Sequence, residues 1–192
     1  MCWSDVRAGR NDSMAVDIVF ETHGTTEDNE AGIATGWLRG RLSAAGRENA
    51  SSLGGRRRDD QIAAVFTSDL RRAVETAEIA FAGSSVPILQ DWRLRECDYG
   101  LLNGARVAEV HGMRLDHLDN PYPGGESWTQ ATDRVAGFCA DLRPRWDGQR
   151  VLVIGHLATR WGLERALEGR SLAELLSEEF SWQEGWTFQL EG

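Results

Sequence analysis

The sequence predicts an α/β protein in which helices cover both faces of a mainly parallel sheet, a three-layer α/β/α sandwich. Short apolar runs rich in β-branched residues occur at 16–20, 62–66, 87–89 and 150–154. Segments with a helical period separate these runs, as is typical of parallel strands joined by crossover helices. With 192 residues, the chain is long enough for one such domain and too short for two.

Composition excludes several classes of protein. The formal net charge of -9 argues against sequence-independent binding to nucleic acid, which requires a basic surface. No apolar run approaches the roughly 20 residues of a membrane span. Cys2, Cys97 and Cys139 are odd in number and far apart, so we expect neither a disulfide framework nor a zinc site, and we expect a cytoplasmic protein.

The chain divides into an N-terminal arm at 1–14, expected to be disordered, and a single domain at 15–192. Helices are expected at 43–54, 70–81, 105–118, 128–143, 157–168 and 172–176, and an edge strand at 182–190. Glycines make 28–40 irregular. The arginines at 56–58 fit a solvated helix end, and phosphate binding is the alternative.

Two of the predicted strands end at a histidine. The first run stops at Glu21 and Thr22 and continues as His23-Gly24-Thr25-Thr26, and the strand at 150–154 is followed by Gly155-His156. Parallel strands place their carboxyl ends at one edge of the sheet, where Arg71 or Arg72, from the first turn of a helix, would join both histidines. Two histidines, an arginine and a carboxyl group suit phosphoryl transfer, with one histidine as the nucleophile.

Three other residues are candidates either for the site or for the surface. His111 and His117 lie six residues apart, so they would not share a helix face as metal ligands do, and we expect both on the surface. Trp37 is either an aromatic wall of a pocket or an anchor for its loop in a small hydrophobic cluster.

Five segments resemble, in order, the motifs of the histidine phosphatase (phosphoglycerate mutase-like) superfamily: THGTTEDN, TSDLRRAVETA, LRECDYGLLNG, PGGESW and VLVIGHLATR. The resemblance covers about 17–167. It implies a phosphoglycerate mutase-like fold in which His23 becomes phosphorylated and Glu96 is the general acid. It also selects Arg72 rather than Arg71, and makes His156 the second histidine of the site.

The resemblance extends to the surroundings of the phosphate. It implies that Asn29 contacts the phosphate or orients the loop, and it places Gly125, Glu126 and Ser127 at the border of the pocket. From the residues themselves, Gly24 allows close approach of the backbone, and Thr25 and Thr26 offer hydroxyl and N–H groups to an anion. The family normally has Arg before the nucleophile, where this chain has Thr22, and Gly-Gly after the second histidine, where it has Leu157-Ala158. Arg160 either reaches inward to replace the missing arginine or is an ordinary surface residue.

The resulting expectation is a phosphatase that needs neither metal nor cofactor and hydrolyses a small phosphate monoester through a phosphohistidine. The expected partner is this small-molecule substrate, not nucleic acid or a membrane, and a homodimer is left open. The alternatives are a diverged member that performs other chemistry or only binds an anion, and a phosphomutase. We expect the mutase less because the family's mutases are generally longer.

Overall fold

The computed structural model describes residues 15–191 and confirms the expected sheet. Within these residues the sheet has five strands in the order β3-β2-β4-β1-β5. They are β1 (Val16–Thr22), β2 (Ile62–Thr67), β3 (Ile88–Gln90), β4 (Arg150–Gly155) and β5 (Trp186–Leu190). The first four in this order run parallel, and β5 pairs with β1 in the antiparallel sense. The arm expected at 1–14 lies outside the described residues.

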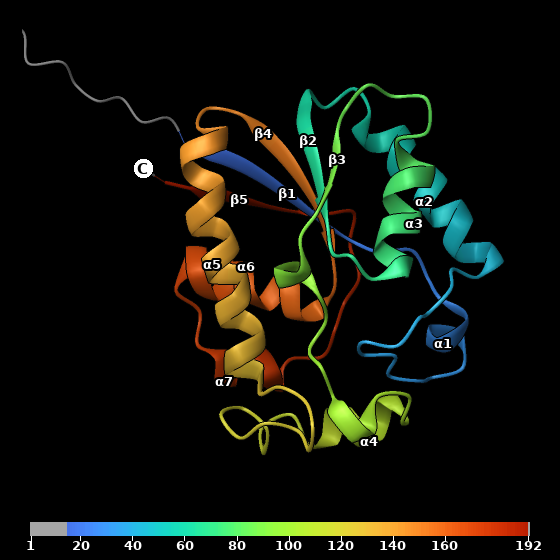
Figure 1. Ribbon diagram of the computed structural model, residues 1–192, viewed down its shortest axis with the longest axis vertical. Coiled ribbons are helices and arrows are strands. Elements are labelled where there is room, and N and C mark those ends of the chain that lie inside the picture. The colour runs from blue at the N-terminus through green and yellow to red at the C-terminus, as the bar shows by residue number, and fades with distance from the viewer. Residues whose placement is uncertain (1–14, 192) are drawn as a thin grey trace, which may run out of the picture.

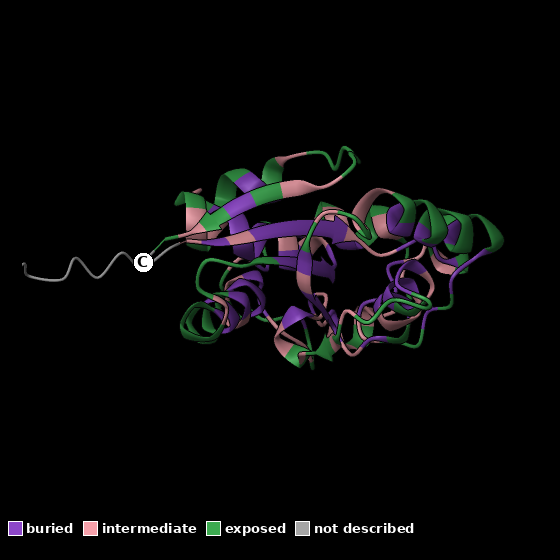
Figure 2. Ribbon diagram, turned by 90° about the horizontal axis from the view of Figure 1, so that it is seen from above, coloured by how far each residue is buried: buried purple, intermediate pink, exposed green. Residues whose placement is uncertain are grey.

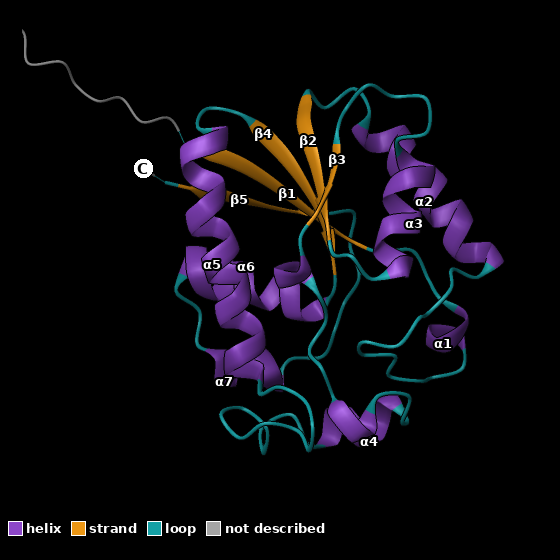
Figure 3. Ribbon diagram, viewed as in Figure 1, coloured by secondary structure: helices purple, strands orange, loops and turns teal. Residues whose placement is uncertain are grey.

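Helices cover both faces of this sheet (Figures 1 and 3). α2 and α3 lie on one face, and α5 and α6 lie on the other. The described helices are α1 (Glu27–Glu30), α2 (Ala44–Arg57), α3 (Arg71–Ala80), α4 (Val107–Gly112), α5 (Trp128–Trp146), α6 (Leu157–Glu168) and α7 (Leu172–Ser177). The three-layer α/β/α sandwich is therefore confirmed. In this part of the chain no helix is long and apolar enough to cross a membrane.

Alternation along β1 explains how one strand serves two cores. Successive side chains of a strand point to opposite faces of the sheet. Ile18 and Phe20 accordingly pack in the cluster shared with α5 and α6, and Val19 packs in the cluster shared with α2 and α3. Seen from above, the buried strands lie between helices whose outer surfaces are exposed (Figure 2).

A third cluster supports the segments beyond the sheet, where α4 and α7 lie (Figure 1). Its centre is aromatic: the rings of Trp128 and Trp161 are 4.9 Å apart in an edge-on arrangement. Tyr99 and Tyr122 pack beside them at 5.3 Å from one another. Because these rings belong to α5, α6 and two loops, they hold the loop that carries Tyr99 in place over the sheet edge.

The structure corrects three local expectations. The helix expected at 105–118 is only α4, because the chain leaves the helix at Gly112 and continues in turns that bury His117, which was expected on the surface. The His117 ring stacks on Tyr122 at 3.8 Å. The arginines at 56–58 are not simply a solvated helix end, because Arg57 forms an ion pair with buried Glu21 at 2.9 Å.

Candidate active site

The pairing of β1 with β4 places the two expected histidines together. Thr22 lies opposite Gly155, so the next residue of each strand is a histidine. The His23 N–H donates to the Gly155 carbonyl at 3.1 Å, and the two imidazole rings lie 4.9 Å apart. The expected meeting of the two strand ends is thus a direct consequence of the register.

Arg72 lies between these rings and is almost fully buried, at 2% exposure. Its Nε donates to His23 Nε2 and its Nη2 to His156 Nδ1, each at 3.3 Å. The Gly36 and Leu38 carbonyls accept its remaining hydrogen bonds. Among residues 15–191, no carboxylate forms a salt bridge with Arg72. The Glu96 and Asp28 carboxylates act on its charge only from beyond salt-bridge distance. A buried guanidinium without a salt-bridge partner is a natural site for an anion.

The hydrogen bonds of His23 identify Nε2, which accepts from Arg72, as its nucleophilic nitrogen. Nδ1 donates to the Gly24 carbonyl at 2.8 Å, so in the neutral ring Nε2 carries the lone pair. Burial and the neighbouring positive charge of Arg72 lower the pKa of His23 to about 3, against the opposing effect of the Gly24 carbonyl. His23 is therefore neutral at pH 7 and points its lone pair toward the Arg72 guanidinium.

His156 is held in the opposite tautomer. Because Arg72 can only donate, His156 Nδ1 is the acceptor, and Nε2–H donates to Ser68 Oγ at 2.7 Å. Burial first, and then the charge of Arg72, lower the pKa of His156 well below its ordinary value. Ser68 thus fixes the orientation of a neutral imidazole whose Nδ1 faces the same guanidinium as His23 Nε2.

The Glu96 carboxylate lies at the N-terminus of α6. It accepts hydrogen bonds from the backbone N–H groups of Cys97, Leu157 and Ala158 at 2.9, 3.3 and 3.1 Å. A carboxylate has about four lone-pair sites, so one remains for a proton of the substrate or of water. The helix terminus also favours negative charge at this point.

The loop after His23 is fixed by close backbone packing. The Gly24 N–H donates to Thr76 Oγ1 at 3.0 Å, and a Cβ atom at Gly24 would lie 2.4 Å from the Gly46 carbonyl oxygen. Glycine is therefore required for α2 to approach the loop this closely. The next turn is closed by a capping box between Thr26 and Asn29.

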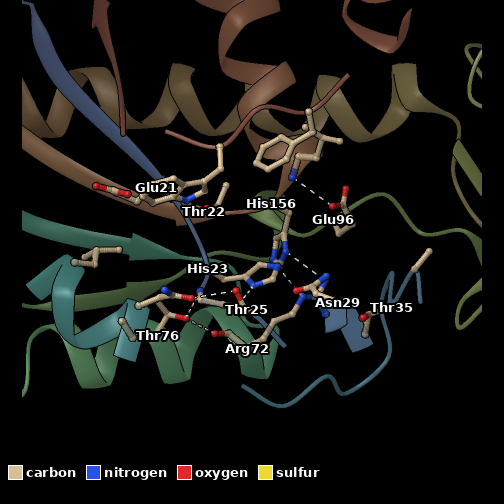
Figure 4. A pocket seen from close by; sticks show the side chains of 18 of the residues that line it. Glu21, Thr22, His23, Thr25, Asn29, Thr35, Arg72, Thr76, Glu96 and His156 are labelled. Carbon is tan, nitrogen blue, oxygen red and sulfur yellow. Dashed lines mark hydrogen bonds between the residues drawn. The ribbon is translucent and has the colours of Figure 1, made fainter. Parts of the chain in front are cut away.

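A cavity of about 710 Å³ opens onto this group of side chains. It is lined by eight of the residues expected at the site: Thr22, His23, Gly24, Thr25, Asn29, Arg72, Glu96 and His156. In Figure 4, Glu21 and Thr22 lie to one side of His23, and Asn29, Thr35 and Glu96 lie to the other. The cavity therefore extends in two directions from the histidines.

Five other residues expected at the substrate or at the pocket border are not among those that line this cavity: Trp37, Gly125, Glu126, Ser127 and Arg160. Trp37 anchors its loop, with Nε1 donating to the Glu96 carbonyl at 2.7 Å and Arg95 stacked on its ring. Glu126 forms an ion pair with Arg134, and buried Ser127 caps α5. Arg160 forms an ion pair with Glu164 and stacks on Trp186. Its guanidinium therefore does not replace the arginine that the family normally has at the position of Thr22.

Sequence reasoning missed further residues of the site. Ser68 follows β2 directly, so the same strand-end argument that selected the histidines could have found it. Thr76 lies one helical turn after Arg72 and lines the cavity. His111 and Arg56 also line it, although the former was expected on the surface and the latter at a solvated helix end. Tertiary packing brings both there, and the sequence indicated only phosphate binding as the alternative for the arginines at 56–58.

The arrangement is suited to transferring a phosphoryl group. It combines a neutral imidazole nucleophile, a buried cation for the phosphoryl oxygens and a carboxylate for the proton of the leaving group. Within the described part of the chain, no group of three or more His, Cys, Asp or Glu side chains is arranged to hold a metal ion.

Comparisons with known proteins agree with this geometry. The model of the histidine phosphatase superfamily (branch 1) matches residues 18–183. The chain is 31% identical to the probable phosphoglycerate mutase GpmB of Salmonella typhi, over 92% of this chain and 93% of that protein. The structure of Bacillus stearothermophilus YhfR superposes with a TM-score of 0.76 at 28% identity, covering 88% of each chain. A mycobacterial glucosyl-3-phosphoglycerate phosphatase, solved with VO3, superposes with a TM-score of 0.73 at 26% identity, covering 86% of this chain and 87% of that one.

Proposed function

The chain belongs to the histidine phosphatase superfamily, and from that premise we propose that it hydrolyses a small-molecule phosphate monoester through a phosphohistidine at His23. The observation that carries this proposal is the lone pair of His23 Nε2, which faces an Arg72 guanidinium that forms no salt bridge among the described residues. A phosphate ester placed between them would bring its phosphorus to the nucleophile and its charged oxygens to the cation.

The reaction would proceed in two displacements. His23 Nε2 attacks phosphorus, the bond to the ester oxygen breaks, and the Glu96 carboxylate relays the proton of the monoanionic ester to the departing alcohol. Water then attacks the phosphohistidine, Glu96 takes a proton from that water and passes it to the phosphate, and inorganic phosphate leaves with His23 again neutral. Arg72 would bind the oxygens of the phosphoryl group throughout, and His156 would offer Nδ1 to the same group.

The direct test is release of inorganic phosphate from an aryl phosphate in the presence of EDTA. Wild-type protein should release phosphate, and His23→Ala should lose this activity while its circular dichroism spectrum stays unchanged. Full activity in the Ala variant would remove His23 from the nucleophilic role. Activity that requires an added metal ion would contradict the proposed chemistry.

A phosphomutase is the second candidate, favoured by the names of relatives at 30–31% identity. Chain length, which the sequence-based argument used against a mutase, does not separate the two, since GpmB and this chain match over more than nine-tenths of each. The distribution of product does separate them. A phosphatase gives inorganic phosphate in equal amount to the alcohol, and a mutase returns the phosphoryl group to an acceptor hydroxyl.

A diverged protein that only binds an anion is supported by one observation, the Thr at position 22. It would bind inorganic phosphate at Arg72 but would release none from any ester.

We further propose a cytoplasmic location, since Cys97 and Cys139 are free and buried, as suits a reducing compartment.

A further inference from the structure

One wall of the cavity is a face of α2 that leads away from His23. Asn49, Ser52, Leu53 and Arg56 line the cavity and recur three or four residues apart, as residues on one helix face do. Thr25, next to the nucleophile loop, donates to Asn49 Oδ1 at 3.0 Å. Arg56 comes seven residues after Asn49, so the two backbone positions are about 10 Å apart along the helix axis. Arg56 therefore lies farther along this wall than Asn49, and its guanidinium reaches Glu21 of β1.

Arg56 forms only long polar contacts with its neighbours in the fold. Its Nε is buried without a hydrogen-bond partner, and its Nη2 reaches Glu21 only at 3.4 Å. Glu21 has a closer partner in Arg57, at 2.9 Å. The remaining contact of Arg56, with Glu184, is 3.9 Å long. Because the Arg56 side chain is 25% exposed and its ion pairs are long, its guanidinium can donate to a ligand oxygen in the cavity.

The segment 180–184 faces this wall and presents apolar surface to the cavity. Phe180 and Trp182 line the same cavity and are 45% and 56% exposed, respectively. The segment is held to α2 because the Glu184 carbonyl accepts from Arg57 at 2.9 Å. Exposed aromatic side chains that line a cavity are typical of a ligand-binding surface, since a ligand that covers them removes apolar area from water.

The charges around Arg56 indicate what kind of group it would bind. Glu21 and Glu184 approach its guanidinium, and Glu184 itself lines the cavity. A second anion would be repelled by the Glu184 carboxylate, but an uncharged group with a carbonyl oxygen could accept from Arg56 without that cost.

We infer that the leaving group of the substrate lies along this wall, with a flat apolar body against Trp182 and an uncharged carbonyl-bearing group at Arg56. The inference rests on the proposed phosphatase function, and it makes Arg56 and Trp182 determinants of specificity. His111 and Val107 of α4 line the other end of the cavity. According to this inference, the leaving group does not bind there.

Three synthetic esters test this: biphenyl-4-yl phosphate, its 4′-carboxamide and its 4′-carboxylate. Dissociation constants are measured by titration calorimetry in a His23→Ala background, in which binding is separated from turnover. The carboxamide should bind about 10- to 100-fold more tightly than the unsubstituted ester, as a hydrogen bond to a charged group allows. Arg56→Met should reduce this ratio to about 1. Trp182→Ala should weaken all three esters and preserve the ratio.

The matched control is His111→Ala, which alters the opposite end of the cavity and should leave the ratio intact. Arg56→Met should fold, because Glu21 keeps Arg57, and thermal unfolding checks this. A ratio that survives Arg56→Met, or that collapses in His111→Ala, would overturn the inference. So would tightest binding of the carboxylate. Turnover of the same esters by wild-type protein reports separately on the phosphatase function, since a protein can show the expected ratio and yet release no phosphate.

Discussion

Replacing His23 by Asn should flatten the dependence of stability on pH between pH 7 and pH 5. The pKa of His23 is about 3 in the folded protein, and an unfolded histidine has a pKa of 6.5. Between these values the unfolded chain binds a proton that the folded protein does not. Stability therefore falls as the pH is lowered, and the variant, which has no imidazole at this position, is spared this loss.

The size of the effect follows from the two pKa values. A pH of 5 is about 1.5 units below the pKa of the unfolded histidine. Protonation of the unfolded chain therefore costs the folded protein about 2 kcal/mol of stability at this pH. A chain of 192 residues loses about 2–4 °C of melting temperature per kcal/mol. The fall in melting temperature from pH 7 to pH 5 should thus be smaller by about 4–8 °C in His23→Asn than in wild-type protein.

Thermal unfolding followed by circular dichroism at the two pH values measures this difference. Asn is chosen because its amide can donate to the Gly24 carbonyl as Nδ1–H does. Comparing the two falls in melting temperature removes the contribution of groups that titrate alike in both proteins. Equal falls in wild-type and variant protein would show that His23 is already protonated in the folded state at pH 5, and the argument for a neutral nucleophile would fail.

Three further predictions concern the groups around His23. Glu96→Gln should reduce turnover mainly for alkyl phosphates, because an aryl alcohol leaves without a proton, and an equal loss for both would indicate positioning instead. Gly24→Ala should lower the melting temperature and turnover together, because its Cβ would meet the Gly46 carbonyl. The control Gly55→Ala, which has open space inside α2, should be stabilising by up to about 1 kcal/mol. Thr22→Arg should lower the Michaelis constant for an aryl phosphate by at most about 100-fold, by supplying a bidentate contact, and an unchanged constant in a folded variant would point to specialised chemistry.

The central part of the site was accessible from sequence because local patterns determine it. A β-branched run that ends at a histidine specifies both the strand and the place of the side chain, and the sheet edge brings His23 and His156 together. The start of α3 indicates Arg71 or Arg72 in the same way, and the resemblance to the histidine phosphatases selects Arg72. These predictions depend on short segments whose structure is set by their own residues.

The outer walls of the cavity were not accessible in this way. Arg56 and His111 reach it through the packing of α2 and of α4, which are distant from β1 in sequence. Conversely, Glu126 and Arg160 lie in motifs that suggest a binding role, yet each is engaged by a neighbouring charge, Arg134 or Glu164. Whether a charged side chain faces a ligand or a partner depends on tertiary contacts that spacing alone does not specify.

The most direct test of the account is isolation of the phosphorylated enzyme. Protein mixed briefly with an aryl phosphate is denatured in alkali, digested and analysed by mass spectrometry. We predict one added phosphoryl group on the peptide that contains His23, stable in alkali and lost in acid, and none in His23→Ala. A phosphoryl group on another residue, or none during sustained release of inorganic phosphate, would contradict the proposed mechanism.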